Sequence, residues 1–460
     1  MMDWDSFTPL TALTHLDGRN SRKLSALKPH FSEFAWMKLR LDVIVSYVKS
    51  ISTKLTGKTV PRADDKKLSS LIDSFSLTEA RKVVQLEKTV NHDLKAIELY
   101  LVNELMKRKL ARYIPYVNLG IGSEDINSIA LGLQLVGSRG EILIPEFERV
   151  VHSLSILAEQ EKNTLMIART HGQSANVTTF GKELANTLSR LLGELEIFRT
   201  LQLQAKCLGE VGTLQAFIGV DSSIDWLKFT DMFVETFGLQ PSHAGTQVTP
   251  YDSVIRYLQS LFRMNGILLD LVKNLWLYVL MGYLIVKKKD SEVGSAGMPH
   301  KVNPIYFEGT EGGLEMANGI IETLVRKLPI NRLQRDFSDS TLRRNLVMPI
   351  ALGLLSYQSI VKGLSRIAVN REAMRDDLCS HAEVWVETVK TYGLMHGISD
   401  MYDRLKKETR GRTLSASDLE ALISGLPLST KEKKELINLC DGTHNPYPAR
   451  IVDEIVKRSL

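Results

Sequence analysis

The spacing of apolar residues along the chain predicts long amphipathic helices. In two stretches an apolar side chain recurs every three or four residues: Phe34, Met37, Leu41, Ile44 and Val48 in the first, and Leu184, Leu188, Leu191, Leu195 and Phe198 in the second. This spacing places them on one face of an α-helix, as in packed helix bundles. Sustained alternation of apolar and polar residues, which is typical of strands, is scarce. The pattern therefore predicts an all-α fold.

The prolines leave room for such helices. No proline occurs in residues 146–240, 251–298 or 350–426. Because proline breaks the interior of a helix, these intervals can hold very long uninterrupted helices. Within them, residues 251–286 are apolar on more than one face, which indicates a helix that is buried all round. Such a helix could lie at the centre of a monomer's core or be buried in the contact between subunits, and the sequence favours neither alternative.

Two changes along the chain predict domain boundaries. Pro115, followed by Gly120 and Gly122, interrupts the helical pattern, and near residue 364 the sequence becomes more charged and more often broken by turns. We therefore expect three helical domains, in residues 1–114, 115–363 and 364–460. The second would be a bundle of long helices, with a polar loop at residues 290–304.

Composition excludes several classes of protein. The chain has 460 residues, is 44% hydrophobic and carries a net charge of only +5 with interspersed signs, so we expect a globular protein without a nucleic-acid stripe. The most apolar window, 274–286, is too short to cross a bilayer, and the N-terminus lacks the pattern of a signal peptide. These features predict a soluble protein with no membrane partner.

The reactive side chains suggest a cytoplasmic enzyme without a cofactor. Cys207, Cys379 and Cys440 lie far apart and show no metal spacing, which favours a reducing compartment, the cytoplasm. The chain has no phosphate-binding glycine loop, no dinucleotide-binding motif and no nucleophile elbow. We therefore expect chemistry that uses no metal and no cofactor.

The strongest candidate for chemistry is the run 294–304, Gly-Ser-Ala-Gly-Met-Pro-His-Lys-Val-Asn-Pro. Its glycines and prolines oppose helix formation, and it carries a hydroxyl, an imidazole, an ammonium and an amide side chain between helical stretches. Ser295 follows a glycine, and Lys301 could stabilise its ionised form. Lys301 and Asn303 alternate with Val302, so both can point to one side of an extended segment. The alternative is a plain polar loop.

Other polar runs offer weaker candidates. His171, in the run 169–173 before a long helix, is a candidate acid or base, or a structural histidine. In the run 91–93, Asp93 could orient the imidazole of His92, or Asn91 and Asp93 could merely cap helices. Ser123 could be an N-cap, at a helix end that also attracts anions. Arg335 and Arg344 could clamp a phosphate or carboxylate, or could form ion pairs with nearby aspartates.

Together these runs resemble the signature motifs of the fumarase/aspartase superfamily. The run 294–304 resembles its signature loop, and the blocks 17–19, 91–93, 123–127, 169–173, 246–247 and 334–340 are most similar to the adenylosuccinate lyases of the long bacterial and plant type. The resemblance covers nearly the whole chain. It implies a three-domain all-α fold and a homotetramer with a central helix bundle, in which three subunits build each active site. It therefore favours subunit contact for residues 251–286.

The resemblance also implies a reaction and its residues. The reaction would be β-elimination of fumarate from adenylosuccinate, giving AMP, and from the succinylated aminoimidazole-carboxamide ribotide of purine synthesis. Ser295 would be the base, His171 the acid with support from His92, and Lys301 and Asn303 would hold the succinyl carboxylate. The remaining implied substrate-binding residues are Arg19, Arg335, Ser340 and Arg344 for the phosphate, Ser123 and Gln247 for the succinyl group, and Asn91, Asp93, Thr170 and Met298. Since a serine base must be ionised by its surroundings, closure of the loop should gate turnover.

The sequence departs from the usual pattern of this family beside several motifs. The unusual residues are Asn20 for tyrosine, Gly122 for threonine, Ser174 for proline, Gln215 for asparagine, and Ala296 and Gly297 after the serine of the loop. Two other hypotheses therefore stay open: a related lyase that releases fumarate from a different succinyl compound, and a non-catalytic scaffold with the same fold. The retained Ser295, His171 and Lys301 argue against the scaffold.

Overall fold

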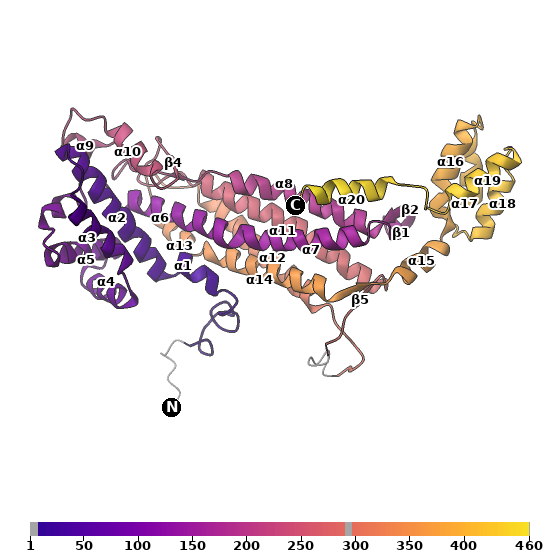
Figure 1. Ribbon diagram of the computed structural model, residues 1–460, viewed down its shortest axis with the longest axis horizontal. Helices are drawn as coiled ribbons and strands as arrows, with labels where there is room; N and C mark the ends of the chain where they lie inside the picture. Colours follow the sequence, from indigo (N-terminus) through magenta and orange to yellow (C-terminus); the bar gives the residue numbers. More distant parts are fainter. Residues whose placement is uncertain (1–7, 290–296, 460) are drawn as a thin grey trace. The chain divides into compact units, whose positions relative to one another are not determined.

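The computed structural model describes residues 8–289 and 297–459. These residues are mostly α-helical, with a few short strands, so the prediction of an all-α fold is confirmed. They group into two compact units. Figure 1 draws the helices and strands coloured along the chain, from indigo at the N-terminus to yellow at the C-terminus. Unit 1 comprises Met1–Pro145, Glu196–Arg263 and Glu315–Leu355, and unit 2 comprises Glu146–Leu195, Met264–Leu314 and Ser356–Leu460. The division into three domains stays a prediction.

The helices are α1 (Lys28–Phe31), α2 (Glu33–Thr56), α3 (Arg62–Asp73), α4 (Leu77–Val90), α5 (Asp93–Lys107), α6 (Ser123–Ser138), α7 (Ile144–Gln160), α8 (Phe180–Thr200), α9 (Gln215–Ile218), α10 (Trp226–Glu235), α11 (Asp252–Leu280), α12 (Ile305–Lys327), α13 (Ser338–Arg343), α14 (Val347–Ser365), α15 (Arg371–Cys379), α16 (Val386–Met395), α17 (Met401–Thr409), α18 (Ala416–Ser424), α19 (Thr430–Leu439) and α20 (Tyr447–Lys457). Within residues 8–289 and 297–459 the strands form three two-stranded sheets, which pair β1 (Leu165–Thr170) with β2 (Gln173–Thr179), β3 (Gln204–Ala205) with β4 (Gln240–Pro241), and β5 (Leu284–Val286) with β6 (Ile367–Val369).

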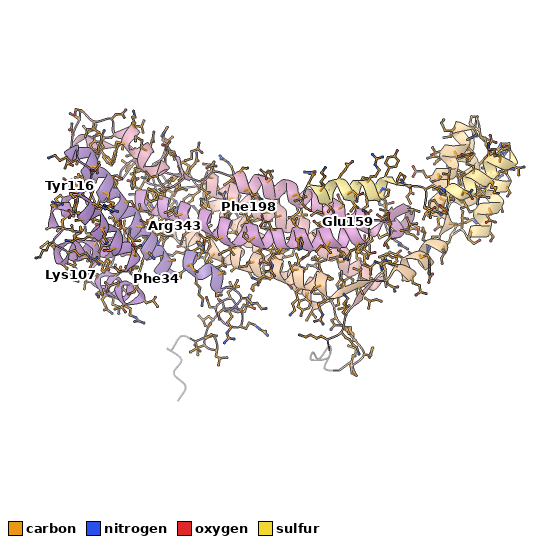
Figure 2. The ribbon with its side chains drawn as sticks, in the orientation of Figure 1. Phe34, Lys107, Tyr116, Glu159, Phe198 and Arg343 are labelled. Atoms are coloured by element: carbon orange, nitrogen blue, oxygen red, sulfur yellow. The ribbon has the colours of Figure 1, made fainter. Side chains whose placement is uncertain are left out.

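In unit 1, helices α2 to α5 pack around the first predicted apolar face. The N-cap Ser32 accepts a hydrogen bond from Ala35 N at 3.2 Å, and α2 ends at Gly57, whose φ of +66° suits glycine. The face predicted from the sequence turns inward, and Ile44 is fully buried. Phe34, labelled in Figure 2, stacks on Phe75 with 5.6 Å between the ring centroids. The predicted face of α2 is therefore confirmed.

In unit 2, the C-terminal helices α16 to α19 share a small apolar core. Met401, Ile423 and Leu436 are completely buried in it. The helices α18 and α19 begin with capping boxes at Ser415 and Ser429, in which each serine exchanges hydrogen bonds with an acidic residue three positions later. These local signals fix where the two helices begin.

The predicted apolar segment 251–286 forms the long helix α11 and then strand β5. Leu258, Leu268 and Leu275 are fully buried, but Leu280 in the last turn is 69% exposed. One chain therefore covers most of this segment but leaves the last turn of α11 partly exposed, while Tyr283 and Leu284 beyond it are buried again. A separate stretch, Ser338–Ser365, is long and apolar enough to cross a membrane, but 61% of its apolar window is buried within the protein, as in a core helix.

Candidate active site

The junction of α4 and α5 holds three of the predicted residues of unit 1. Asn91 adopts a left-handed conformation with φ of +50° and ends α4. His92 is the N-cap of α5, and its Nδ1 accepts a hydrogen bond from Lys95 N at 3.2 Å. Asp93 pairs with the buried Arg40 at 2.9 Å and lies 3.7 Å from His92 Nδ1. Asn91 therefore caps α4, as one of the alternatives suggested, whereas α5 is capped by His92 and not by Asp93, which is its first helical residue.

The start of α6 differs from the sequence-based interpretation. Gly122, and not Ser123, is the N-cap, and Asp125 Oδ2 accepts a hydrogen bond from Gly122 N at 2.8 Å. Ser123 is the first residue of the helix and is half-buried. Asp125 is 1% exposed and also binds Lys206 Nζ and the backbone N–H groups of Leu208 and Gly209. This carboxylate fixes the loop before Ser123 against the loop that follows Lys206.

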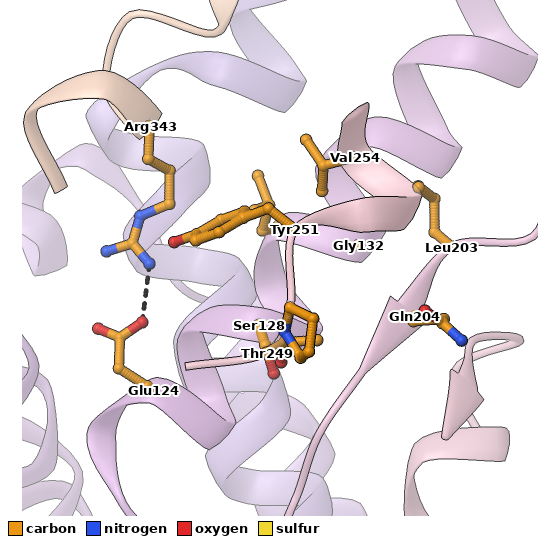
Figure 3. Close-up of a pocket in the computed structure, with 11 residues that line it drawn as sticks. Glu124, Ser128, Gly132, Leu203, Gln204, Thr249, Tyr251, Val254 and Arg343 are labelled. Carbon is orange, nitrogen blue, oxygen red and sulfur yellow. Dashed lines mark hydrogen bonds and ion pairs between the residues drawn. The ribbon is translucent and has the colours of Figure 1, made fainter. Parts of the chain in front are cut away.

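Glu124 is the centre of a buried ion-pair network. Its carboxylate contacts Arg343 at 2.9 Å and Arg335 at 3.0 Å, and it accepts a hydrogen bond from Asn127 at 2.7 Å. Figure 3 shows Arg343 reaching down to Glu124 beside the ring of Tyr251. Burial alone would raise the pKa of Glu124, but the guanidinium groups of Arg343 and Arg335 lower it below its ordinary value. Glu124 is therefore held ionised.

The pocket beside this network is small. It measures about 20 Å³ and is lined by Glu124, Tyr251, Arg343 and residues around them (Figure 3). This volume holds about one water molecule. The pocket therefore belongs to the support of the arginines and is too small for a nucleotide.

Arg335 is already engaged on several sides. Besides Glu124, its Nε lies 3.7 Å from Asp339, and its NH1 donates a hydrogen bond to Gln247 Oε1 at 3.3 Å. The amide nitrogen of Gln247 in turn donates to Glu210 Oε2 at 3.1 Å. The predicted ion pair between Arg335 and a nearby aspartate is thus present, and it joins Arg335 and Gln247 in one network.

The other predicted phosphate-binding residues lie in different surroundings. Arg344 is exposed and borders a cavity of about 90 Å³ that is also lined by Asp93, Arg40 and Arg343. Ser340 is only 4% exposed, so its hydroxyl is not at a surface of the single chain. Arg19 is exposed in the turns before α1. Unit 1 thus brings Asp93 and Arg344 to one cavity.

In unit 2, His171 occupies the tip of a hairpin. The sequence suggested a polar run before a helix, but residues 165–179 form two antiparallel strands in which Thr170 pairs with Gln173. His171 and Gly172 have φ of +54° and +74°, as a type I′ turn requires. Among the described residues, the imidazole has no hydrogen-bond or ion-pair partner. Such a φ is uncommon for histidine, and such conformations concentrate at functional sites.

The base of this hairpin is anchored by an arginine. Arg169 NH2 pairs with Asp377 at 2.6 Å, and its NH1 donates to the hydroxyl of Tyr283 at 3.0 Å. Burial would raise the pKa of Asp377, but hydrogen bonds from Tyr283 and Arg169 lower it. A bulge between Ala168 and Arg169 shifts the register close to the tip. These contacts orient the strand that carries Thr170 and His171.

Part of the signature loop lies within the described residues. Met298 and Lys301 are exposed, and a turn links Lys301 N to Met298 O at 3.0 Å. Asn303 is half-buried and comes just before α12. The proposed base Ser295 and its neighbour Ala296 lie outside the described residues. In residues 8–289 and 297–459 no group of histidine, cysteine and acidic residues could hold a metal ion.

Several supporting residues were missed in the sequence. In the sequence Glu124 stood out only as a member of the run 123–127, because nothing there places it near Arg343, 219 residues away. Arg40, Asn127 and Glu210 carried no signal of their own. A buried arginine in a mostly apolar helix, as Arg40 is in α2, is the one pattern that could have drawn attention to such a network.

Comparisons with known proteins identify the family. Residues 18–319 match the family model described as lyase, and residues 331–444 match the one described as adenylosuccinate lyase C-terminal. The adenylosuccinate lyase of Legionella pneumophila (strain Corby) is 35% identical over 451 residues, which are 97% of this chain and 99% of that protein. The adenylosuccinate lyase of Escherichia coli K12 is 34% identical over the same shares.

Solved structures agree on the fold. A fumarate lyase from Mesorhizobium sp. BNC1 has a TM-score of 0.73 at 18% identity, covering 94% of this chain and 97% of that chain. The 3-carboxy-cis,cis-muconate lactonizing enzyme of Pseudomonas putida has a TM-score of 0.71 at 18% identity, covering 95% and 97%. The fold and the lyase model define the class, the fumarase/aspartase superfamily. Within this class, the chain belongs to the adenylosuccinate lyase family.

Proposed function

We propose that the protein catalyses the reversible β-elimination of fumarate from adenylosuccinate, giving AMP, and from the succinylated aminoimidazole-carboxamide ribotide of purine biosynthesis. The likeness to adenylosuccinate lyases over 97% of the chain carries this proposal. In the reaction a proton leaves Cβ of the succinyl group, the carbon–nitrogen bond breaks, and the departing nitrogen receives a proton. The products are fumarate and AMP from adenylosuccinate, and fumarate and the aminoimidazole-carboxamide ribotide from the second substrate.

The first step needs a base and a place for negative charge. Ser295 removes the proton, and Lys301 and Asn303 hold the carboxylate on which the charge develops. Electrostatic stabilisation at that point contributes a large part of the rate of such reactions. Exposed Lys301, which has no ion pair among the described residues, is free to take up this role when the loop closes over the substrate.

The second step needs an acid at the nitrogen. His171 donates this proton, and its place at the tip of a two-residue turn supports the role because the backbone fixes it while the imidazole has no competing partner. His92 assists on the same side with Nε2, since its Nδ1 is used as the cap of α5. Both histidines are exposed and can therefore reach a ligand.

The remaining residues bind the substrate. Arg19, Arg335, Ser340 and Arg344 grip the phosphate, and Ser123 and Gln247 bind the succinyl group. Asn91, Asp93, Thr170 and Met298 complete the contacts. Arg344 beside the cavity near Asp93 supports the phosphate assignment most directly. Arg335 would bind phosphate while it remains paired with Glu124.

We further propose a soluble, cytoplasmic homotetramer whose active sites are shared between subunits. The candidate residues fall into two groups, with His171, Lys301 and Asn303 in unit 2 and the phosphate-binding and succinyl-binding residues in unit 1. The uncovered end of α11, with Trp276, Leu277 and Leu280 at its surface, supports a contact with other subunits. No nucleic acid, metal or cofactor takes part.

Turnover of adenylosuccinate by the purified protein, followed by its ultraviolet absorbance, tests the proposal, with Ser295→Ala as the control. We expect activity in the unmodified protein and a loss of about 10²-fold or more in the variant, as for removal of a general base. Inactivity on both purine substrates would favour the related lyase of different specificity. Inactivity on a wider panel of succinyl compounds would favour the scaffold.

A further inference from the structure

Gly122 lies directly against Glu210. Its φ of −103° is open to any residue, so conformation does not require glycine there. A Cβ atom built on Gly122 would lie 2.9 Å from Cδ and Oε1 of Glu210 and 3.1 Å from its Cα. The carboxylate of Glu210 therefore occupies the space that a side chain at position 122 would fill, directly beside Ser123.

Glu210 also helps to orient the side-chain amide of Gln247. The amide nitrogen of Gln247 donates to Glu210 at 3.1 Å, and its oxygen accepts from Arg335 at 3.3 Å. Because the two ends of the amide differ, this pair of bonds fixes its direction. The N–H donors of Gln247, which suit a carboxylate ligand, are turned toward Glu210.

The charge of Glu210 is not balanced by its neighbours. Nearby cations are matched by buried acids: Lys206 by Asp125, and Arg335 and Arg343 by Glu124 and Asp339. Glu210 has no ion pair among the described residues and is exposed. It therefore adds one unpaired negative charge next to Ser123 and Gln247.

We propose that Glu210 is a specificity-determining residue, which disfavours the doubly charged succinyl group at the Ser123–Gln247 corner relative to a less charged group. This inference rests on the proposed function, which assigns Ser123 and Gln247 to the succinyl group. A like charge close to a ligand carboxylate repels it, and capture of the Gln247 donors removes a hydrogen bond that the ligand would accept. Both effects act on substrate affinity.

Glu210→Gln removes the charge and keeps the shape. We expect the KM for adenylosuccinate to fall about three- to thirtyfold, as expected for loss of one nearby like charge, with kcat changed by less than about twofold. The inhibition constant of AMP, which has the phosphate but no succinyl group, should stay the same. Glu235→Gln, at an exposed glutamate of α10, is the matched control for net charge.

The outcomes separate this inference from the proposed function. An active unmodified protein whose KM does not respond to Glu210→Gln, or responds equally to Glu235→Gln, overturns the inference alone. An inactive unmodified protein with an active Glu210→Gln variant supports the inference and shows that the natural substrate differs at its succinyl end. If calorimetry finds that neither form binds adenylosuccinate or AMP, both the function and the inference are wrong.

A second pair of variants tests the packing without any substrate. Gly122→Ala alone should lower the melting temperature, because its Cβ meets Glu210 at 2.9 Å. In a Glu210→Ala background the same substitution should cost less, because only the 3.1 Å contact with the Cα of residue 210 remains. Equal losses in the two backgrounds would contradict the proposed exclusion of a side chain at position 122 by Glu210.

Discussion

The network around Glu124 and the tip of the β1–β2 hairpin place functional side chains in opposite ways. Glu124 is 4% exposed and contacts two arginines and an asparagine. His171 is exposed, and its imidazole has no partner among the described residues; only the backbone of the turn positions it. The binding groups are thus pre-organised by side-chain pairs, whereas the proposed acid is pre-organised by a turn.

This difference separates stability from activity. A buried charge that loses its partner costs several kcal/mol, so the Glu124 network cannot be altered without a loss of stability. An exposed side chain at a turn contributes little to stability. We therefore expect substitutions at the hairpin tip to affect the rate and substitutions in the network to affect folding first.

The largest effect is expected for His171→Asn. Loss of a general acid should lower kcat about 10²- to 10⁴-fold, while the melting temperature stays close to that of the unmodified protein, because asparagine also tolerates the left-handed conformation. Steady-state kinetics and thermal melting measure the two effects. His444→Asn, at another exposed histidine of unit 2, is the control. A small change in kcat would remove His171 from the mechanism, and a large loss of stability would contradict the contrast drawn above.

Glu124→Gln should mainly affect stability. It leaves Arg335 and Arg343 without their shared carboxylate, and we expect a loss of about 2–3 kcal/mol in the free energy of unfolding at pH 7. Because the folded protein lowers the pKa of Glu124, its contribution is complete above the ordinary value of 4.5 and is lost as pH falls through the lower folded value. The difference between the two proteins in urea denaturation should therefore shrink below about pH 4.5. A difference that is independent of pH would show that the ionised pair is not its source.

The sequence predicts local features well. The apolar face of α2 follows from its spacing, and the prolines mark intervals in which α8 and α11 are found. The uncovered end of α11 could not be predicted, because periodicity does not tell which neighbour covers a face. The hairpin at residues 165–179 was also missed: its two-residue turn reads His-Gly and not one of the usual Asn-Gly or Asp-Gly signals.

The candidate site shows the same division between local and distant information. Helix-cap roles depend on neighbours within four residues: the one at Asn91 was foreseen as an alternative, and the one expected at Asp93 is taken by the adjacent His92. The pairing of Glu124 with Arg343 joins residues far apart in the chain, and polar residues give no periodic signal that would reveal it. The motifs therefore located most of the candidate residues, while the contacts that hold them became visible only in the structure.

The smallest effect is expected at Gly172, where the turn itself is tested. Gly172→Ala places a side chain at φ of +74°, and since a Cβ there would meet nothing within 4 Å, the cost of about 1 kcal/mol comes from the backbone alone. A shift of the turn would also move His171, so kcat should fall by about tenfold or less. Gly193→Ala in α8 has equally open space but an ordinary φ, and should instead stabilise the protein by about 0.5–1 kcal/mol. Urea denaturation and kinetics on both variants provide the measurement. If Gly172→Ala lowers stability but leaves kcat unchanged, the backbone of the hairpin tip does not position the acid. The contrast between the Glu124 network, which is held by side-chain pairs, and His171, which is held by a turn, would then be wrong for His171.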